Sequence, residues 1–445
     1  MTRVAPTIVS SIVYLLSISA FLYSVTAEEE QWSFIVLADW HSAEALAVNP
    51  HNEMVNDILY DQIHHVKNTY GGELVVLPGD SNVGKWDMEA FATKFRPELK
   101  ISKRVLLAGR NCYGAMRAIF VEAGYDHILM AVGDHELGGN KWIPQSSKVK
   151  SLDKYRQGFK NGFNEEPETG EFLFKKAIGS APSRPMNTPF KQTSYAHQHK
   201  NVLFITLDAF LKMPDVFFDR DHGLGGEGMI TCTIEGEHLN WFENVLIEAR
   251  KDETIKHIIV QAHLPIVQPV RKVSCSDQFM DHGEESVLWK TMVRYNVDVY
   301  LAGEVHTNTV TKDSISNLIQ VVSRDNSFNN FLKIDVTDNI LNITSYNEIG
   351  HKPKNNHNYE AYGNLVLNKA VICPTIGDGI FVKPNIFTKD NTMDSTQKNV
   401  RLDTLDSGSR FLKKSALVPI ACGSGSSGVC GSAPHNGSKR IQNML

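Results

Sequence analysis

The segment SFIVLADWH, residues 33–41, decides the fold class. Its apolar run ends at Ala38, and the polar residues Asp39 and His41 follow directly. A short continuous apolar run of this kind predicts a strand that is buried on both faces. Apolar residues then recur at helical spacing between residues 54 and 66, so a helix follows the strand. A strand followed by a helix is the repeating unit of an α/β fold.

The same alternation of short apolar runs and amphipathic stretches continues towards the middle of the chain. Helices are expected over residues 239–251 and 285–295, each before another apolar run. The further predicted strands are residues 74–77, 128–132, 202–207, 257–262, 297–302 and 318–322. The pattern therefore indicates an α/β protein.

Composition excludes several classes of protein. The chain has 445 residues with a net charge of −5, of which 42% are hydrophobic and 21% charged. This profile is typical of a folded soluble protein and excludes disordered, collagen-like and multi-span membrane chains. No dense Lys/Arg block occurs, so we expect no dedicated nucleic-acid surface.

The first 27 residues differ from the rest of the chain, because no charged residue stands between Arg3 and Glu28. An apolar stretch that ends in the small residues before Glu28 favours a cleaved secretory signal peptide. The alternative is an uncleaved signal anchor, since about 20 apolar residues can span a bilayer. Both interpretations predict a secreted, cell-surface or endomembrane-lumen protein, which touches a membrane only if this segment stays uncleaved.

Six cysteines and two glycosylation sequons are compatible with export. The cysteines permit disulfides but are too few for a disulfide-built scaffold, and the sequence leaves their pairing open, with Cys422 and Cys430 as the simplest pair. The sequons at Asn342 and Asn436 predict a glycoprotein if the host glycosylates.

The chain also divides by composition. Residues 138–196 are polar and rich in Pro, Gly and Lys, which indicates an insertion that shapes the substrate entrance. Beyond residue 350 the alternation fades, and residues 423–438 are rich in Gly and Ser. We expect a main domain over residues 30–350, with the insertion at about 138–196, and a C-terminal extension over 351–445 with a Gly/Ser-rich tail.

Carboxylates and imidazoles follow five of the predicted strands at the point where each strand ends. They occur in Asp39-Trp40-His41, Gly79-Asp80, Gly133-Asp134-His135-Glu136, His263-Leu264-Pro265 and Gly303-Glu304-Val305-His306. Ligands of open α/β sheets bind where strands end, so we expect these side chains to converge in one crevice. Carboxylates and imidazoles together are typical ligands of divalent metal ions.

This order of motifs resembles the calcineurin-like metallophosphoesterase family, whose pattern is Asp-x-His, Gly-Asp, Gly-Asn-His-(Asp/Glu), a His usually followed by Pro, and Gly-His-x-His. The segments HLNWFENVLIEARKDETIKHIIVQAHLP (residues 238–265) and LWKTMVRYNVDVYLAGEVH (residues 288–306) are similar to the family's sequences around the last two motifs. The resemblance implies a β-sandwich with helices on both sides, an α/β/β/α arrangement. The purple acid phosphatase branch is disfavoured, because Val83 stands where that branch has a Tyr.

The resemblance also implies a centre for two divalent metal ions. The ligands of the first metal would be Asp39, His41, Asp80 and His306, and those of the second Asp80, as the bridging group, with Asp134, His263 and Glu304. His135 matches the catalytic histidine of the family, which contacts the phosphate and helps the leaving oxygen depart. Two cations in such a pair bind phosphate, and the water that bridges them becomes hydroxide near neutral pH.

Two positions depart from the family pattern, since Asp134 replaces an Asn and Glu304 replaces a His. Carboxylates in place of amide and imidazole favour Mg, Mn or Ca at the second site, whereas the first site suits Mn, Fe or Zn. The added negative charge predicts slower catalysis or a higher working pH. The alternative is that Glu304 points away and the second site is weak.

Outside these motifs, His197 and His199 lie two residues apart beside Tyr195. A solvated strand edge is the favoured interpretation, and a second metal-binding patch is the alternative.

We therefore expect an exported, metal-dependent phosphoesterase that hydrolyses small phosphate monoesters or diesters by attack of a metal-bridging hydroxide. Recovery of phosphate from organic esters would suit an enzyme outside the cell. A hypothesis of another class is a non-catalytic binding or scaffold protein that keeps the same fold. The sequence leaves the leaving group and the substrate-binding residues undecided.

Overall fold

The computed structural model describes residues 31–41, 44–51, 53–213, 229–267, 278–306, 308–313, 316–323, 330–348 and 358–369, and the backbone of 380–382 and 399–401. The predicted signal segment, the Gly/Ser-rich tail, the sequon at Asn436 and four of the six cysteines lie outside these residues, whereas Cys112 and Cys232 are buried. Within the described part, no helix is both long and apolar enough to span a bilayer.

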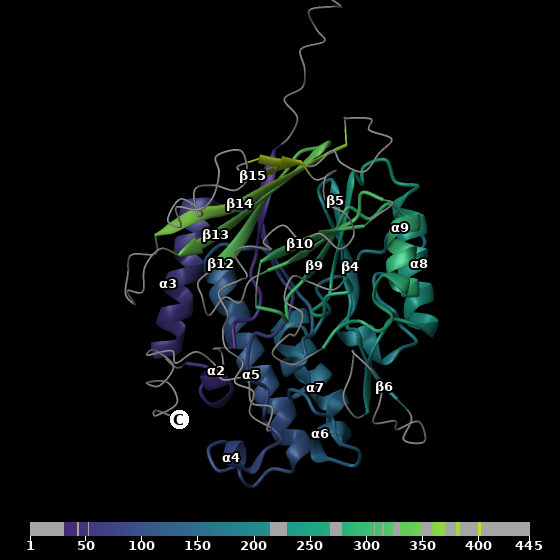
Figure 1. Ribbon diagram of the computed structural model, residues 1–445. Helices are drawn as coiled ribbons and strands as arrows, with labels where there is room; N and C mark the ends of the chain where they lie inside the picture. Colours follow the sequence, from purple (N-terminus) through teal and green to yellow (C-terminus); the bar gives the residue numbers. More distant parts are fainter. Residues whose placement is uncertain are drawn as a thin grey trace, which may run out of the picture.

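Two large β-sheets form the centre of the molecule (Figure 1). The eight-stranded sheet has the order β16-β15-β14-β13-β12-β1-β2-β3 and the six-stranded sheet the order β10-β11-β9-β8-β5-β4. The strands of the first sheet are β1 (Trp32–Val36), β2 (Leu74–Leu77), β3 (His127–Met130), β12 (Asn330–Val336), β13 (Ile340–Glu348), β14 (Tyr359–Asn368), β15 (Ile380–Val382) and β16 (Asn399–Arg401). Those of the second are β4 (Tyr195–His199), β5 (Val202–Thr206), β8 (His257–Gln261), β9 (Val299–Ala302), β10 (Thr309–Lys312) and β11 (Ile319–Val322).

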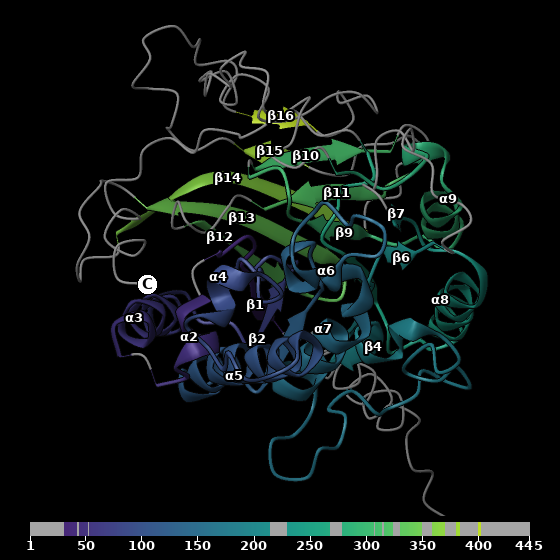
Figure 2. The same ribbon diagram turned by 90° about the horizontal axis from the view of Figure 1, so that it is seen from below.

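Helices cover the outer faces of both sheets (Figures 1 and 2). On the side of the eight-stranded sheet lie α2 (Glu44–Val48), α3 (Glu53–Tyr70) and α5 (Ile101–Glu122), whereas α4 (Glu89–Ala92), α6 (Ser147–Lys150) and α7 (Leu152–Phe159) lie at the lower end of the molecule in Figure 1. On the side of the six-stranded sheet lie α8 (Gly236–Ala249) and α9 (Val287–Arg294), and β6 (Phe210–Lys212) pairs with β7 (Ile230–Cys232) in a small separate sheet. The predicted α/β/β/α arrangement is confirmed.

Alternate residues of one strand face two different cores. Phe34 and Val36 of β1 belong to an apolar cluster that also contains Phe204 and Leu301 of the other sheet, so this cluster fills the space between the sheets. Ile35 belongs to a second cluster, shared with residues of the flanking helices. Burial on both faces is the physical reason that these strands are continuous apolar runs in the sequence.

Most of the strands predicted from the sequence pair in parallel. β1 pairs with β2 and β2 with β3, and in the other sheet β5, β8, β9 and β11 pair in parallel. By contrast, β12, β13 and β14 form antiparallel pairs, and these strands were not expected from the sequence. The expected domain boundary near residue 350 falls between β13 and β14, which pair with each other.

The region predicted as an insertion is packed against the body of the protein. Helix α7 crosses α5 where Gly109 and Gly158 meet, and a Cβ atom at Gly109 would lie 3.1 Å from the Cα of Gly158. A buried ion pair fixes the same helix, because Arg156 Nε lies 2.7 Å from Asp208 Oδ2 and Arg156 Nη2 lies 3.3 Å from Asp208 Oδ1. Residues 138–196 therefore contain well-packed helices despite their polar composition.

Candidate metal centre

The predicted site residues lie in loops that directly follow five parallel strands, three in one sheet and two in the other. Asp39 and His41 follow β1, Asp80 follows β2, Asp134 and His135 follow β3, His263 follows β8, and Glu304 and His306 follow β9. Backbone hydrogen bonds join the loops: the NH groups of Asp39 and His41 donate to the carbonyl oxygens of Gly79 and Asp80, both at 3.1 Å. The structure therefore brings all eight residues to one end of the sandwich.

Five of these eight residues have a left-handed backbone. The φ angles of Asp39, His41, Asp80, Glu304 and His306 are 54°, 48°, 57°, 70° and 53°. Such conformations cost a non-glycine residue about 1–3 kcal/mol each and persist only where surrounding contacts hold them. Their concentration at one place is typical of a functional site.

The glycines that begin two of the motifs allow the backbone to lie close to carboxylates of neighbouring loops. A Cβ atom at Gly133 would lie 2.1 Å from Oδ1 of Asp80, and one at Gly303 would lie 2.6 Å from Oδ2 of Asp39. Any side chain at either position would displace a carboxylate. This contact explains why both motifs begin with glycine.

The ligand set expected for a first metal lies together. Asp39, His41 and His306 offer donor atoms within 4.8 Å of one another. His306 Nε2 lies 3.3 Å from His41 Nε2 and 3.6 Å from Asp39 Oδ1. His41 Nε2 is also 4.0 Å from Oδ2 of Asp80, the residue expected to bridge the two metals.

The second expected set is buried. Asp80, Asp134, His263 and Glu304 offer donor atoms within 4.8 Å of one another. His263 Nε2 lies 2.9 Å from Glu304 Oε2 and 3.1 Å from Asp80 Oδ2. The side chain of Glu304 therefore points into the site and not away from it.

The other ring nitrogen of His263 has a fixed role. Nδ1 lies 2.9 Å from the carbonyl oxygen of Pro78, which can only accept a hydrogen bond. Nδ1 therefore carries the hydrogen, so that Nε2 faces the carboxylates. A ligating histidine typically has its second nitrogen held in this way.

The donor set fits divalent cations. Asp134 Oδ1 and Glu304 Oε1 are buried and have no hydrogen-bond partner among the described residues. Burial, reinforced by Asp80, raises the pKa of Asp134 to about 6, and burial raises that of Glu304 to about 7. Buried carboxylate oxygens without partners are costly, and a cation between them would offset that cost.

His135 lies beside both ligand sets. Its backbone NH donates to Asp80 Oδ1 at 3.1 Å, and its Nδ1 lies 3.0 Å from the carbonyl oxygen of Val83, so Nε2 faces the centre. Although burial opposes it, the carboxylates of Asp134 and Asp80 raise the pKa of His135 to about 9. The ring can therefore hold a proton for a leaving group, although it also belongs to a possible ligand group with His41 and Asp80.

Sequence reasoning assigned no role to Glu136, although it ends the motif that begins at Gly133. Its Oε2 accepts hydrogen bonds from the backbone NH groups of Asp80 and Gly133, at 2.7 and 2.8 Å. Its Oε1 accepts from the backbone and hydroxyl of Ser81, at 3.0 and 2.8 Å, and from Asn82 Nδ2 at 3.0 Å. The carboxylate thus joins the loop after β2 to the loop after β3.

A two-sheet sandwich that gathers carboxylates and imidazoles at one end defines a protein built to hold a pair of cations. The sequence matches the Metallophos model, described as calcineurin-like phosphoesterase, over residues 33–308, and the chain belongs to this family of metallophosphoesterases. Comparison with curated proteins gives no significant match.

Solved structures are similar to this chain at low sequence identity. A dimetal phosphatase from Danio rerio is 14% identical, with a TM-score of 0.45 over 76% of this chain and 99% of that one. A structure of PhoD is 12% identical, with a TM-score of 0.47 over 76% of this chain and 70% of that one. GAP50, the anchor in the inner membrane complex of Plasmodium, is 12% identical, with a TM-score of 0.40 over 76% and 89%.

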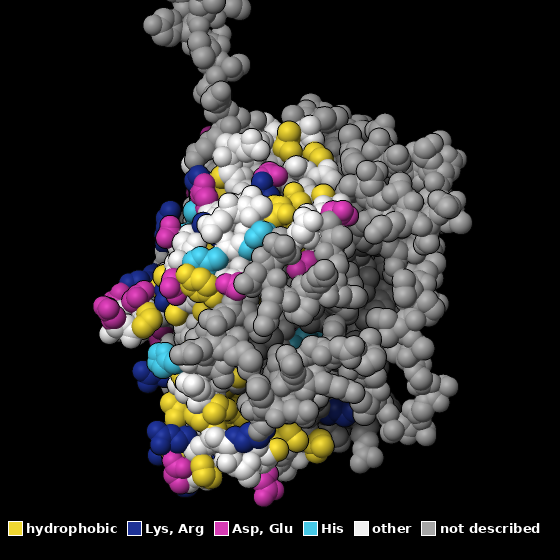
Figure 3. All heavy atoms as spheres, turned by 90° about the vertical axis from the view of Figure 1, so that its left-hand side faces the viewer, with side chains coloured by type: hydrophobic (Ala, Val, Ile, Leu, Met, Phe, Trp, Pro, Cys, Tyr) yellow, Lys and Arg dark blue, Asp and Glu magenta, His cyan; other side chains and the backbone are white. Residues whose placement is uncertain are grey.

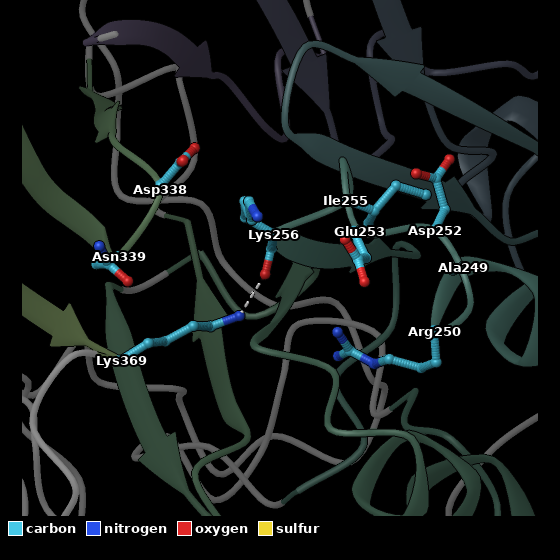
Figure 4. Close-up of a pocket in the computed structure, with 9 residues that line it drawn as sticks. All are labelled: Ala249, Arg250, Asp252, Glu253, Ile255, Lys256, Asp338, Asn339 and Lys369. Carbon is cyan, nitrogen blue, oxygen red and sulfur yellow. Dashed lines mark hydrogen bonds between the residues drawn. The ribbon is translucent and has the colours of Figure 1, made fainter. Parts of the chain in front are cut away.

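A separate cavity of about 370 Å³ lies near the C-terminal end of α8 (Figure 4). Its lining combines the cations Arg250, Lys256 and Lys369 with acidic side chains. Lys369 Nζ donates to the carbonyl oxygen of Lys256 at 2.6 Å, and Arg250 Nε donates to that of Tyr295 at 2.7 Å. None of the predicted ligands lines this cavity, so it does not compete with the metal centre.

Proposed function

We propose that this metallophosphoesterase hydrolyses small phosphate monoesters or diesters at the centre formed by the loops after β1, β2, β3, β8 and β9. The observation that carries the proposal is that the two ligand sets meet at Asp80, with Nε2 of His135 directed at the same place. The residues proposed as metal ligands are Asp39, His41, Asp80, Asp134, His263, Glu304 and His306.

Exposure within the centre indicates the direction of substrate approach. The side chains of His41, His135 and His306 are 23%, 26% and 19% exposed, whereas those of Asp80 and Glu304 are 2% and 3% exposed. The carboxylates and the buried ring of His263 thus form the floor of the centre, and the imidazoles of His41, His135 and His306 form its accessible side. A phosphate ester would enter from the imidazole side.

In the proposed reaction, the cations and the side chains of the protein have different tasks. Two divalent cations bound here would neutralise phosphate oxygens and lower the pKa of a water molecule that acts as the nucleophile. Asp80 holds a carboxylate at the junction of the two sites, and Glu136 fixes the loop that carries it. His135 Nε2 donates a proton to the departing alcohol oxygen, which makes that alcohol a better leaving group.

We propose that the second site prefers cations that favour oxygen ligands, such as Mg, Mn or Ca, and that the first site binds Mn, Fe or Zn. The second set contributes carboxylates from Asp80, Asp134 and Glu304 but one imidazole, whereas the first includes imidazoles from His41 and His306. Hard carboxylate ligands favour hard cations, and imidazoles suit borderline transition metals.

The proposed substrate is a small molecule and not a nucleic acid. On the face shown in Figure 3, the Lys and Arg side chains of the described residues are interspersed with Asp and Glu. A nucleic-acid surface typically gathers basic residues into one patch or stripe.

A comparison of metals and substrates tests the activity. Purified protein would be incubated with p-nitrophenyl phosphate, bis-p-nitrophenyl phosphate and a nucleotide, with each of Mg, Mn, Ca, Zn and Fe or with none. Metal-dependent turnover is expected, and Asp80→Asn, as the matched inactive control, should lower it by at least about 100-fold, because groups that only orient a ligand already contribute 10- to 100-fold. No turnover with any metal, in protein that binds two cations per chain, would favour the scaffold hypothesis.

We also propose that the protein is exported and recovers phosphate from organic esters. Residues 1–27, with their signal-like composition, support this location, and the two sequons agree with it. A C-terminally tagged full chain should appear in the medium or an endomembrane lumen with residues 1–27 removed. A cytosolic, uncleaved protein would contradict the proposal.

A further inference from the structure

Three histidines meet where the edges of the two sheets come together. His127 is the first residue of β3, the edge strand of the eight-stranded sheet. His197 and His199 lie on β4, the edge strand of the six-stranded sheet, and project to the same side because alternate residues of a strand share a face. The ring of His127 has its centroid 4.7 Å from that of His197 and 5.3 Å from that of His199.

The donor atoms of this cluster are close enough to share one ion. His127, His197 and His199 each offer a ring nitrogen within 4.8 Å of the others. All three side chains are partly buried, and Nε2 of His197 is buried without a hydrogen-bond partner among the described residues. Three imidazoles this close cannot all be protonated, and the neutral ring is the form that binds metals.

A carboxylate lies against the cluster. Oε2 of Glu73, just before β2, is 2.9 Å from Nε2 of His199, and its Oε1 accepts from Lys200 Nζ at 2.6 Å. A carboxylate paired with a ligating imidazole is a common feature of metal sites, because it fixes the orientation of the ring. The aromatic ring of Phe174 packs against His197, with centroids 5.3 Å apart, and limits the room for water on that side.

We propose that His127, His197 and His199 bind one transition-metal cation of the zinc or copper class, with Glu73 orienting His199. Three imidazoles with a remaining position for water are a donor set that such cations accept. The site is distinct from the catalytic centre, because His127 begins β3 whereas Asp134 follows its other end. A cation here would tie the edge of one sheet to the edge of the other.

Binding at this site would stabilise the folded state. The three ligands come from two different sheets, so the cation binds the folded protein in preference to the unfolded chain. The alternative is a stack of aromatic rings that packs the sheet edges without a metal. The two alternatives differ in how many cations the chain holds.

The first test counts metals. Full-length protein and a His127→Gln/His197→Gln variant would be saturated with Zn²⁺, desalted and analysed by inductively coupled plasma mass spectrometry. The wild type should retain one more Zn²⁺ per chain than the variant, while activity with saturating Mn²⁺ stays within about twofold. His51→Gln, which changes an exposed imidazole, is the matched control and should retain the wild-type count.

The second test needs no variant and covers the case in which the double variant fails to fold. Crystals of the wild-type protein would be soaked in ZnCl₂ and anomalous data collected above and below the zinc edge. A peak between the three rings is expected. Equal zinc counts in wild type and variant, or anomalous maps with no peak at the rings, would overturn the proposal and leave the cluster as packing.

Discussion

Glu136 Oε2 accepts a hydrogen bond of 2.7 Å from the backbone NH of Asp80 and one of 2.8 Å from the backbone NH of Gly133. Asp80 has a left-handed backbone, with φ of 57°, and therefore depends on such contacts to keep its conformation. One buried carboxylate thus sets the position of the group that joins the two metal sites.

Glu136→Gln should lower kcat by about 10- to 100-fold and weaken metal binding to a similar degree, the range found when groups that orient ligands are lost. The amide can place only one oxygen where the carboxylate places two, so some of the donors lose their acceptor. Steady-state kinetics and metal titration of the folded variant would measure this. Glu122→Gln, an exposed change at the end of α5, is the control, and wild-type kinetics in Glu136→Gln would refute the positioning role.

Asp134→Asn/Glu304→His should shift the metal preference of the second site towards zinc. The double variant replaces two hard oxygen donors by an amide and an imidazole, which suit borderline cations. The ratio of activity with Zn²⁺ to activity with Mn²⁺, measured at saturating metal, should rise. An unchanged ratio would show that these two side chains are not ligands.

Cation binding should release protons below about pH 7, because burial raises the pKa of Asp134 to about 6 and of Glu304 to about 7 in the metal-free protein. Cations bind the deprotonated carboxylates, so apparent affinity should fall as the pH falls through this range. Isothermal titration with Mn²⁺ in buffers of different ionisation enthalpy would count the protons. Equal heats in all buffers at pH 6 would contradict the expectation.

His135→Asn should impair poor leaving groups more than good ones. A general acid contributes about 10²- to 10⁴-fold when the departing oxygen needs a proton, and less when the leaving group is already a weak base. The loss of kcat should therefore be larger for an alkyl phosphate than for p-nitrophenyl phosphate. The same loss for both substrates would indicate that His135 acts on phosphate binding or as a metal ligand.

Arg156→Met should destabilise the protein by about 3–5 kcal/mol, because the charge of Asp208 would remain buried without its cationic partner. The double variant Arg156→Met/Asp208→Leu removes both charges and should recover part of this loss. Urea unfolding monitored by circular dichroism would give the free energies. A single variant as stable as the wild type would show that Asp208 finds another partner.

The sequence was most informative for the parallel strands. Burial on both faces makes strands such as β2 and β9 continuous apolar runs, and the polar residues shortly after each run mark the strand end. The strands β12, β13 and β14 were not predicted, because partly exposed residues interrupt their buried ones and no continuous apolar run marks them. In β13, for example, partly exposed and buried residues alternate at the start of the strand.

The order of apolar runs and the polar groups behind them indicated an α/β fold with a crevice of carboxylates and imidazoles, since strand burial and ligand chemistry are local properties of the chain. The resemblance to the metallophosphoesterase family supplied the sandwich arrangement and the roles of the eight candidate residues. Only the tertiary structure decided that Glu304 turns towards His263, that Glu136 holds the loop of Asp80, and that His127 joins two histidines of another sheet. These relationships depend on how separate loops and sheet edges meet in space. No local pattern in the sequence encodes that meeting, because it follows from the packing of the two sheets.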